Sequence, residues 1–131
     1  MSSYAWIAVG GGAAVGAWMR WGLGALLNPV FPMVPLGTVT ANLIAGLLMG
    51  IAMELMARYT VIPPELKLLM TTGFLGGLST FSTFSGEIVT LLTYKEYFWS
   101  ALAIGIHVIG SVALTLLGIY LVKITFSAAS L

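Results

Sequence analysis

A short polar stretch, Gly76 to Ser85 with the sequence GGLSTFSTFS, stands out in an otherwise apolar chain. Two adjacent glycines are poor helix formers, and its five hydroxyl side chains compete with the helix for backbone carbonyls. The stretch therefore predicts a local break in the helix that contains it. Carbonyl oxygens released by such a break are suited to bind a cation. The alternative is a kinked helix, in which the Ser and Thr hydroxyls bond to the carbonyl four residues earlier.

Other polar residues recur at intervals of four, which places each set on one face of a helix. Polar groups inside a membrane usually face the interior of a helix bundle or a water-filled cavity. The sets therefore predict a polar pathway, in which Glu87 either caps a water-filled mouth or only reaches the membrane surface. The sets are Thr38, Asn42 and Gly46; His107, Ser111 and Thr115; Thr83 and Glu87; and Gly12, Gly16 and Arg20.

Arg20 favours an anion as the ion in this pathway, because it is the only cationic residue placed well inside an apolar run. Phe81 and Phe84 lie three residues apart beside the expected break, on one helix face. Aromatic rings have a positive edge, so two rings turned edge-on could contact a small anion. A Phe pair at helical spacing is, however, far more often explained by ordinary packing.

The composition fixes the class of protein that must position these residues. Of 131 residues, 60% are apolar, 7% are charged and none is cysteine, whereas soluble domains carry about 25% charged residues. An integral membrane protein is expected, and soluble, disordered and disulfide-rich classes are excluded. A net charge of +1 gives no reason to expect a nucleic-acid partner. One histidine, with neither cysteine nor aspartate, provides no catalytic set, so we do not expect an enzyme.

The apolar runs predict a single all-helical domain over residues 1–131. A membrane-spanning helix needs about 20 mostly apolar residues, and the short polar and Pro-containing segments between the runs are loops. Short loops predict antiparallel neighbours. Glycine pairs (Gly12/Gly16, Gly46/Gly50 and Gly73/Gly77) are expected where helices approach closely. The expected spans are 4–27, 36–57, 66–93 and 98–122.

The basic residues give almost no signal for orientation in the membrane. With four spans, Arg58, Lys67 and Lys123 lie on one side, and Lys95 and Arg20 lie towards the other. An excess of basic residues normally marks the cytoplasmic side. Three against two is compatible with one weakly specified orientation, or with insertion in both orientations followed by antiparallel pairing.

Three motifs, in order along the chain, resemble those of one family. Gly76 to Phe84 matches the pattern GGxTTFSTF, with Ser79 in place of its first Thr. The first span has the pattern GxxxGAxxR followed by Trp21, where an aromatic residue, more often Tyr, is usual; the second has GTxxxNxxxG from Gly37 to Gly46. These patterns, the length and the four spans resemble the Fluc (CrcB) fluoride channels of bacteria.

The resemblance implies an antiparallel, dual-topology homodimer in the bacterial inner membrane that passively exports fluoride through two pathways. It implies a break in the third helix at mid-membrane, where backbone carbonyls of Gly76 and Ser79 from both copies hold a structural Na⁺. Phe81 and Phe84 would contact fluoride with their ring edges, while Asn42 would donate from its amide. Further pathway roles are implied for Ser82 and Thr83, which would continue a polar track, and for Arg20, which would support a vestibule. The expected place of His107, Ser111 and Thr115 on the pathway comes from their spacing.

Two other classes of function remain open from the residues. A small multidrug-resistance exporter is also short and four-helical, but it needs a carboxylate inside the first span, where this chain has Arg20. A membrane assembly protein that transports nothing would use the polar sets only to hold its helices together. Anion flux through the purified protein in lipid vesicles separates the last class from a channel.

Overall fold

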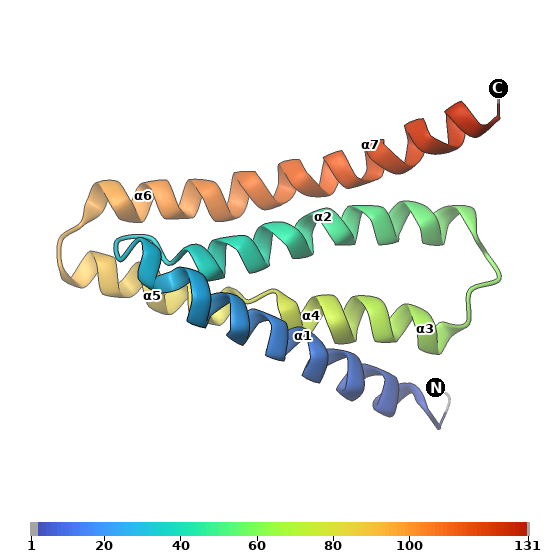
Figure 1. The fold of residues 1–131 in the computed structure, drawn as a ribbon, viewed down its shortest axis with the longest axis horizontal. Coiled ribbons are helices and arrows are strands. Elements are labelled where there is room, and N and C mark those ends of the chain that lie inside the picture. The colour runs from blue at the N-terminus through green and yellow to red at the C-terminus, as the bar shows by residue number, and fades with distance from the viewer. Residues whose placement is uncertain (1–2, 131) are drawn as a thin grey trace.

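Four long helical segments follow one another along the chain. The structure, a computed structural model, describes residues 3–130. Figure 1 shows the segments running antiparallel, so that α1 begins and α7 ends at the same end of the molecule. The third segment comprises α3, η2, α4 and α5, and the fourth comprises α6, η3 and α7. The bounds are α1 Ala5–Leu27, η1 Asn28–Val30, α2 Leu36–Arg58, α3 Pro64–Leu68, η2 Leu69–Leu75, α4 Gly76–Leu78, α5 Phe81–Thr93, α6 Tyr97–Gly105, η3 Ile106–Gly110 and α7 Ser111–Ala129.

Short turns close the antiparallel pairs. At the first turn, Oδ1 of Asn28 accepts hydrogen bonds from the backbone N–H groups of Gly37 at 2.8 Å and Thr38 at 3.3 Å. It thereby satisfies N–H groups at the start of α2 that have no partner within the helix. The turn before α6 uses Lys95 with a positive φ of 58°. The fourth helical segment continues to Ala129, beyond the end at residue 122 expected from the sequence.

Glycines lie at the closest helix crossings. A Cβ atom added to Gly12 in α1 would lie 2.8 Å from the backbone N of Phe74. One added to Gly46 in α2 would lie 2.8 Å from the carbonyl oxygen of Ser111. Both positions are too close for any side chain, so glycine permits backbone-to-backbone contact there. The role predicted for the glycine pairs is confirmed at Gly12, Gly16, Gly46, Gly50, Gly73 and Gly77.

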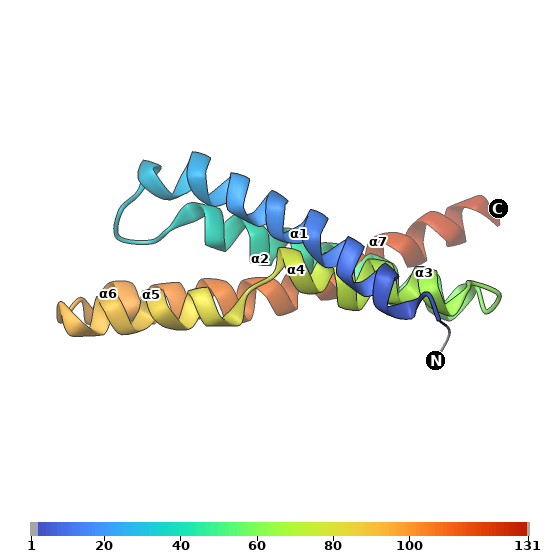
Figure 2. The same ribbon diagram turned by 90° about the horizontal axis from the view of Figure 1, so that it is seen from below.

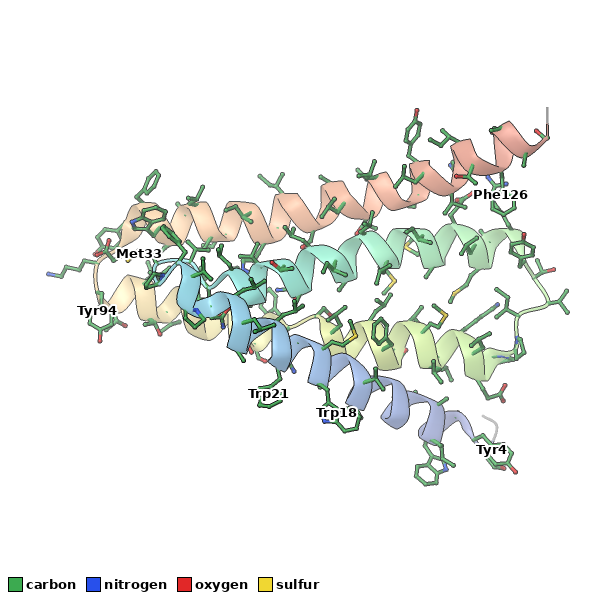
Figure 3. The ribbon with its side chains drawn as sticks, in the orientation of Figure 1. Tyr4, Trp18, Trp21, Met33, Tyr94 and Phe126 are labelled. Atoms are coloured by element: carbon green, nitrogen blue, oxygen red, sulfur yellow. The ribbon has the colours of Figure 1, made fainter. Side chains whose placement is uncertain are left out.

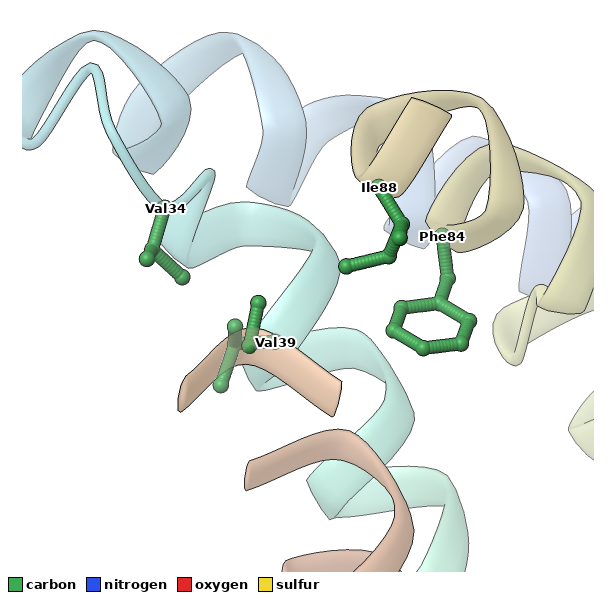
Figure 4. Close-up of a cluster of buried hydrophobic side chains, with 5 residues drawn as sticks. Val34, Val39, Phe84 and Ile88 are labelled. Atoms are coloured by element: carbon green, nitrogen blue, oxygen red, sulfur yellow. The ribbon is translucent and has the colours of Figure 1, made fainter. Parts of the chain in front are cut away.

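The buried apolar side chains form two small clusters, both of which include residues from the first half of α2. Figure 4 shows Val34, just before α2, and Val39, near its start, facing Phe84 and Ile88 of α5. Ala103 of α6 completes this cluster. The second cluster packs α2 against the helix before α5 and consists of Ala41, Ala45, Leu75 and Leu78.

Large apolar side chains cover the outside of the bundle. Trp6 is 74% exposed and Trp21 is 76% exposed, and Figure 3 shows Trp18 and Trp21 pointing away from the ribbon. By length and composition, α2 and the helix Tyr97–Ala129 are apolar enough to cross a membrane. An apolar exterior of this extent favours a lipid surrounding over water.

The third helical segment is interrupted between α4 and α5. Ser79 (φ −78°, ψ 156°) and Thr80 (φ −152°, ψ 121°) have extended backbones, and helix resumes at Phe81. Figures 1 and 2 show the ribbon leaving the helix at this point. Ser79 Oγ donates to the carbonyl oxygen of Leu75 at 2.8 Å, the bond expected of a kinked helix, but the helix ends directly after it.

Candidate functional site

Asn42 of α2 holds the interruption by pairing with both backbone groups of Thr80. Its Oδ1 accepts from the Thr80 N–H at 2.7 Å, and its Nδ2 donates to the Thr80 carbonyl oxygen at 3.0 Å. In a continuous helix the Thr80 N–H would donate to the carbonyl of Gly76. The amide of Asn42 therefore replaces the missing helical partner of Thr80.

The hydroxyl of Thr80 caps the N-terminus of the next helix, α5. Its Oγ1 accepts from the backbone N–H of Thr83 at 3.1 Å, as an N-cap residue does. Ser82 Oγ lies 3.4 Å from the same hydroxyl. In a continuous helix the N–H of Thr83 would donate to the carbonyl oxygen of Ser79. The sequence motif contains Thr80, but its spacing gave no reason to assign it this role.

These side-chain bonds release backbone carbonyls in α4 and directly after it. The helical donors for the carbonyls of Gly76 and Ser79 are taken by Asn42 and by the Thr80 hydroxyl. The carbonyl of Gly77 instead accepts from Nε of Arg20 at 3.1 Å. Carbonyl oxygens are ligands that hard cations such as Na⁺ prefer. The chemistry of Gly76 and Ser79 thus fits a small cation bound by main-chain oxygens.

A cleft of about 440 Å³ opens beside the interruption. Its walls come from α2, from η2 and α4 before the interruption, from α5 after it, and from η3 and α7. It brings together several residues that the sequence placed on separate helices. The predicted site residues that line it are Asn42, Gly76, Ser79, Phe81, Phe84, His107, Ser111 and Thr115.

The two phenylalanines occupy different environments in this cleft. Their ring centroids are 5.6 Å apart in an edge-to-face arrangement. Phe84 is 7% exposed and packs in the apolar cluster, whereas Phe81 is 77% exposed. In an edge-to-face pair the positive edge of one ring meets the face of the other. Because Phe81 is exposed, it is available for contact with something outside this chain.

The fourth helical segment contributes polar groups through a local change of helix type. η3 is π-helical, and it contains His107, whose Nδ1 lies 3.0 Å from Nδ2 of Asn42. The imidazole also packs on the Phe84 ring, with centroids 4.5 Å apart. π-helical segments frequently occur at functional sites. The sequence predicted the face of His107 but not the π-helix that carries it.

The two hydroxyls that follow His107 differ in how they are engaged. Oγ1 of Thr115 lies 2.9 Å from the carbonyl oxygens of both Gly46 and Ser111. Its single proton is therefore donated to a backbone carbonyl within the bundle. The Ser111 hydroxyl lines the cleft and has no hydrogen-bond partner among residues 3–130. It is the freer donor of the two.

The remaining predicted residues lie outside the lining of the cleft. Thr38, buried in α2, donates from Oγ1 to Oε1 of Glu87 at 2.5 Å. Glu87 therefore faces the bundle rather than extending alone to the surface. Ser82 and Thr83 are exposed on α5, next to Phe81. Arg20 is engaged at Gly77, and its contact there is structural in this arrangement.

Comparisons with known proteins give the family. The model of the family described as CrcB-like protein, Camphor Resistance (CrcB) matches residues 7–119. A protein of Nitrosospira multiformis named "Fluoride-specific ion channel FluC" is 53% identical over 123 residues, covering 94% of this chain and 96% of the relative. A protein of the same name from Ralstonia pickettii is 50% identical over 127 residues, covering 97% and 100%. These relatives are named as channels and not as enzymes. Together with the helices that are apolar enough to cross a membrane, they indicate a membrane protein. The chain belongs to the CrcB family.

Proposed function

We propose that this chain is a fluoride-specific ion channel that passively exports fluoride across the bacterial inner membrane. The observation that carries the proposal is the cleft at the interruption, where an edge-to-face pair of the exposed Phe81 and the buried Phe84 adjoins hydroxyl and imidazole groups. Relatives that match nearly the whole chain are named as fluoride-specific channels. All four helical segments would cross the membrane, with the interruption near its middle.

Neutral donors suit the transport of fluoride. The ion holds its water tightly, so a pathway must replace this shell while binding weakly enough to release the ion. Hydroxyl protons and ring edges provide such contacts without a fixed positive charge. An inside-negative membrane potential drives an anion outwards by about 2.3 kcal/mol per charge per 100 mV.

A second copy, inserted in the opposite orientation, would complete the channel. Phe81 is exposed, and the cleft is open at the surface of one chain. The antiparallel homodimer would have two fluoride pathways, with the two interruptions meeting at its centre. There, the carbonyls of Gly76 and Ser79 from both copies would hold a Na⁺ ion. Bound Na⁺ would supply positive charge that offsets the desolvation of a nearby anion and joins the two chains.

Replacing either phenylalanine tests the pathway. Phe81→Ile and Phe84→Ile keep an apolar side chain but remove the positive ring edge, so fluoride efflux from reconstituted vesicles should fall to the level of protein-free vesicles. A fluoride-selective electrode measures the efflux, and gel filtration checks that the dimer persists. Phe98→Ile, at an exposed ring outside the cleft, is the matched control and should conduct normally. Undiminished efflux in both cleft variants would refute the role of the rings.

Removing sodium tests the central cation. If main-chain carbonyls of two copies share Na⁺, its replacement by N-methylglucamine should weaken both the assembly and the fluoride flux. Dimer fraction by gel filtration and efflux by electrode are measured in the same two buffers. A channel with equal assembly and flux in both buffers has no such cation.

A further inference from the structure

The interruption determines how the amide of Asn42 is oriented. Thr80 presents an N–H and a carbonyl oxygen side by side to this amide, at 2.7 and 3.0 Å. If the amide were reversed, its NH₂ group would face the Thr80 N–H and its oxygen would face the Thr80 carbonyl. Both contacts would then be repulsive. Only the observed orientation satisfies both backbone groups.

This orientation in turn determines the tautomer of His107. An amide nitrogen has two protons and no acceptor capacity. One proton of Nδ2 goes to Thr80 O, and the other points to Nδ1 of His107 at 3.0 Å. Nδ1 must therefore accept, and an imidazolium is excluded because both of its nitrogens carry protons. The neutral ring consequently carries its proton on Nε2.

The Nε2–H group has no partner within residues 3–130, and the ring that carries it lines the cleft. Asn42 and Phe84 are the residues that His107 contacts through specific interactions, and neither engages Nε2. Within residues 3–130, no fully enclosed side-chain nitrogen or oxygen lacks a hydrogen-bond partner. Nε2 is therefore accessible, and the cleft is the space that the His107 ring lines. Both protons of Asn42, by contrast, are occupied within the protein.

We infer that Nε2–H of His107 is a hydrogen-bond donor to the permeating anion, and that Asn42 and the Thr80 backbone fix the tautomer that provides it. This inference rests on the proposed fluoride channel and changes the roles within it. Asn42 acts through His107 as a positioning residue, and His107 is the residue that contacts the ion. The donation from the Asn42 amide expected from the sequence would require one of its two bonds to open.

The single histidine of the chain makes the tautomer directly measurable. Protein grown with ¹⁵N-histidine and reconstituted in vesicles should give one unprotonated resonance, from Nδ1, and one protonated resonance, from Nε2, in solid-state NMR. Replacing sodium chloride by sodium fluoride should shift the Nε2–H resonance more than that of Nδ1. A proton on Nδ1, an imidazolium, or an Nε2–H resonance insensitive to fluoride would overturn the inference.

Three substitutions at His107 distinguish the role of Nδ1 from that of Nε2. His107→Gln can place an amide donor near the position of Nε2, so it should retain most of the fluoride flux. His107→Asn offers an acceptor near the position of Nδ1 but no donor towards the cleft, and His107→Phe offers neither. Loss of a hydrogen bond to an ion should reduce flux about tenfold or more in these two variants. Gel filtration verifies that each variant remains a dimer.

The ranking of the three variants by fluoride flux tests the inference. Higher flux in His107→Gln than in His107→Asn supports the donor role, whereas equal flux in the two, or full flux in His107→Phe, overturns it. If the variants fail to assemble, the tautomer and its response to fluoride still decide the question in the unaltered protein. If the unaltered protein carries no fluoride, the proposed function fails even where the tautomer is as inferred.

Discussion

At the residue scale, the two asparagines of the chain show that the same side chain can form different sets of hydrogen bonds with the backbone. Among residues 3–130, Asn28 uses only its oxygen, which accepts from the N–H groups of Gly37 and Thr38. Asn42 uses its oxygen and both protons, because an extended residue presents an N–H and a carbonyl together. The sequence predicted that Asn42 lies at the site, since its spacing places it on the face of Thr38. It could not predict the partners, because these depend on where the helix of another segment breaks.

The same substitution at both asparagines should therefore have opposite consequences. Asn28→Asp keeps the accepting oxygen at the start of α2 and adds a negative charge there, which is favourable near a helix N-terminus. Asn42→Asp loses both donors and directs a carboxylate oxygen at the Thr80 carbonyl. A buried group left unpaired costs about 1–3 kcal/mol. Thermal unfolding of the detergent-solubilised protein should show Asn42→Asp markedly less stable and Asn28→Asp unchanged or slightly more stable. Equal losses at the two sites would contradict the pairing with Thr80.

At the element scale, the sequence marks the helix contacts and the interruption, but not the changes of helix type. The four helices were predictable because length and hydropathy determine them, and the glycine pairs marked their crossings. The π-helical segments η2 and η3 were not predictable. A π-turn adds a residue without altering the local composition, so spacing rules based on the α-helix do not detect it. The interruption was predictable because two glycines and five hydroxyls all disfavour continuous helix.

Alanine substitutions distinguish contact glycines from those on the outer face. A Cβ on Gly16 would lie 2.6 Å from the backbone N of Leu78, whereas one on Gly11 has nothing within 4 Å. Gly16→Ala should force α1 away from α4, at an overpacking cost of about 1–3 kcal/mol. Gly11→Ala should be neutral or stabilising by up to about 1 kcal/mol, because alanine has the higher helix propensity. Unfolding temperatures measure both, and a neutral Gly16→Ala would show that the crossing is looser than described.

At the scale of the whole molecule, the distribution of charge bears on how two copies assemble. Figure 1 shows α2 ending, α3 lying and α7 ending at the end of the bundle where α1 begins. Their basic residues Arg58, Lys67 and Lys123 belong to that end, and Lys95 belongs to the turn between α5 and α6 at the other. Arg20 is engaged inside the bundle, at Gly77. The excess at one end is only two basic residues, so the signal that normally selects one orientation is weak. The exposed Phe81 and the cleft open at the surface are what a partner chain would cover.

Added charge should convert this weak signal into a fixed orientation. Lysines at Thr60 and Val61, in the turn between α2 and α3, bias that end towards the cytoplasm; lysines at Thr93 and Tyr94 bias the opposite end. If the channel needs both orientations, each double variant alone should lose fluoride resistance in cells, and co-expression of the two should restore it. If one orientation suffices, one of the double variants should remain active by itself. Since Val61 is 92% exposed and Tyr94 is 75% exposed, the substitutions leave the bundle intact and change only the basic residues that determine orientation.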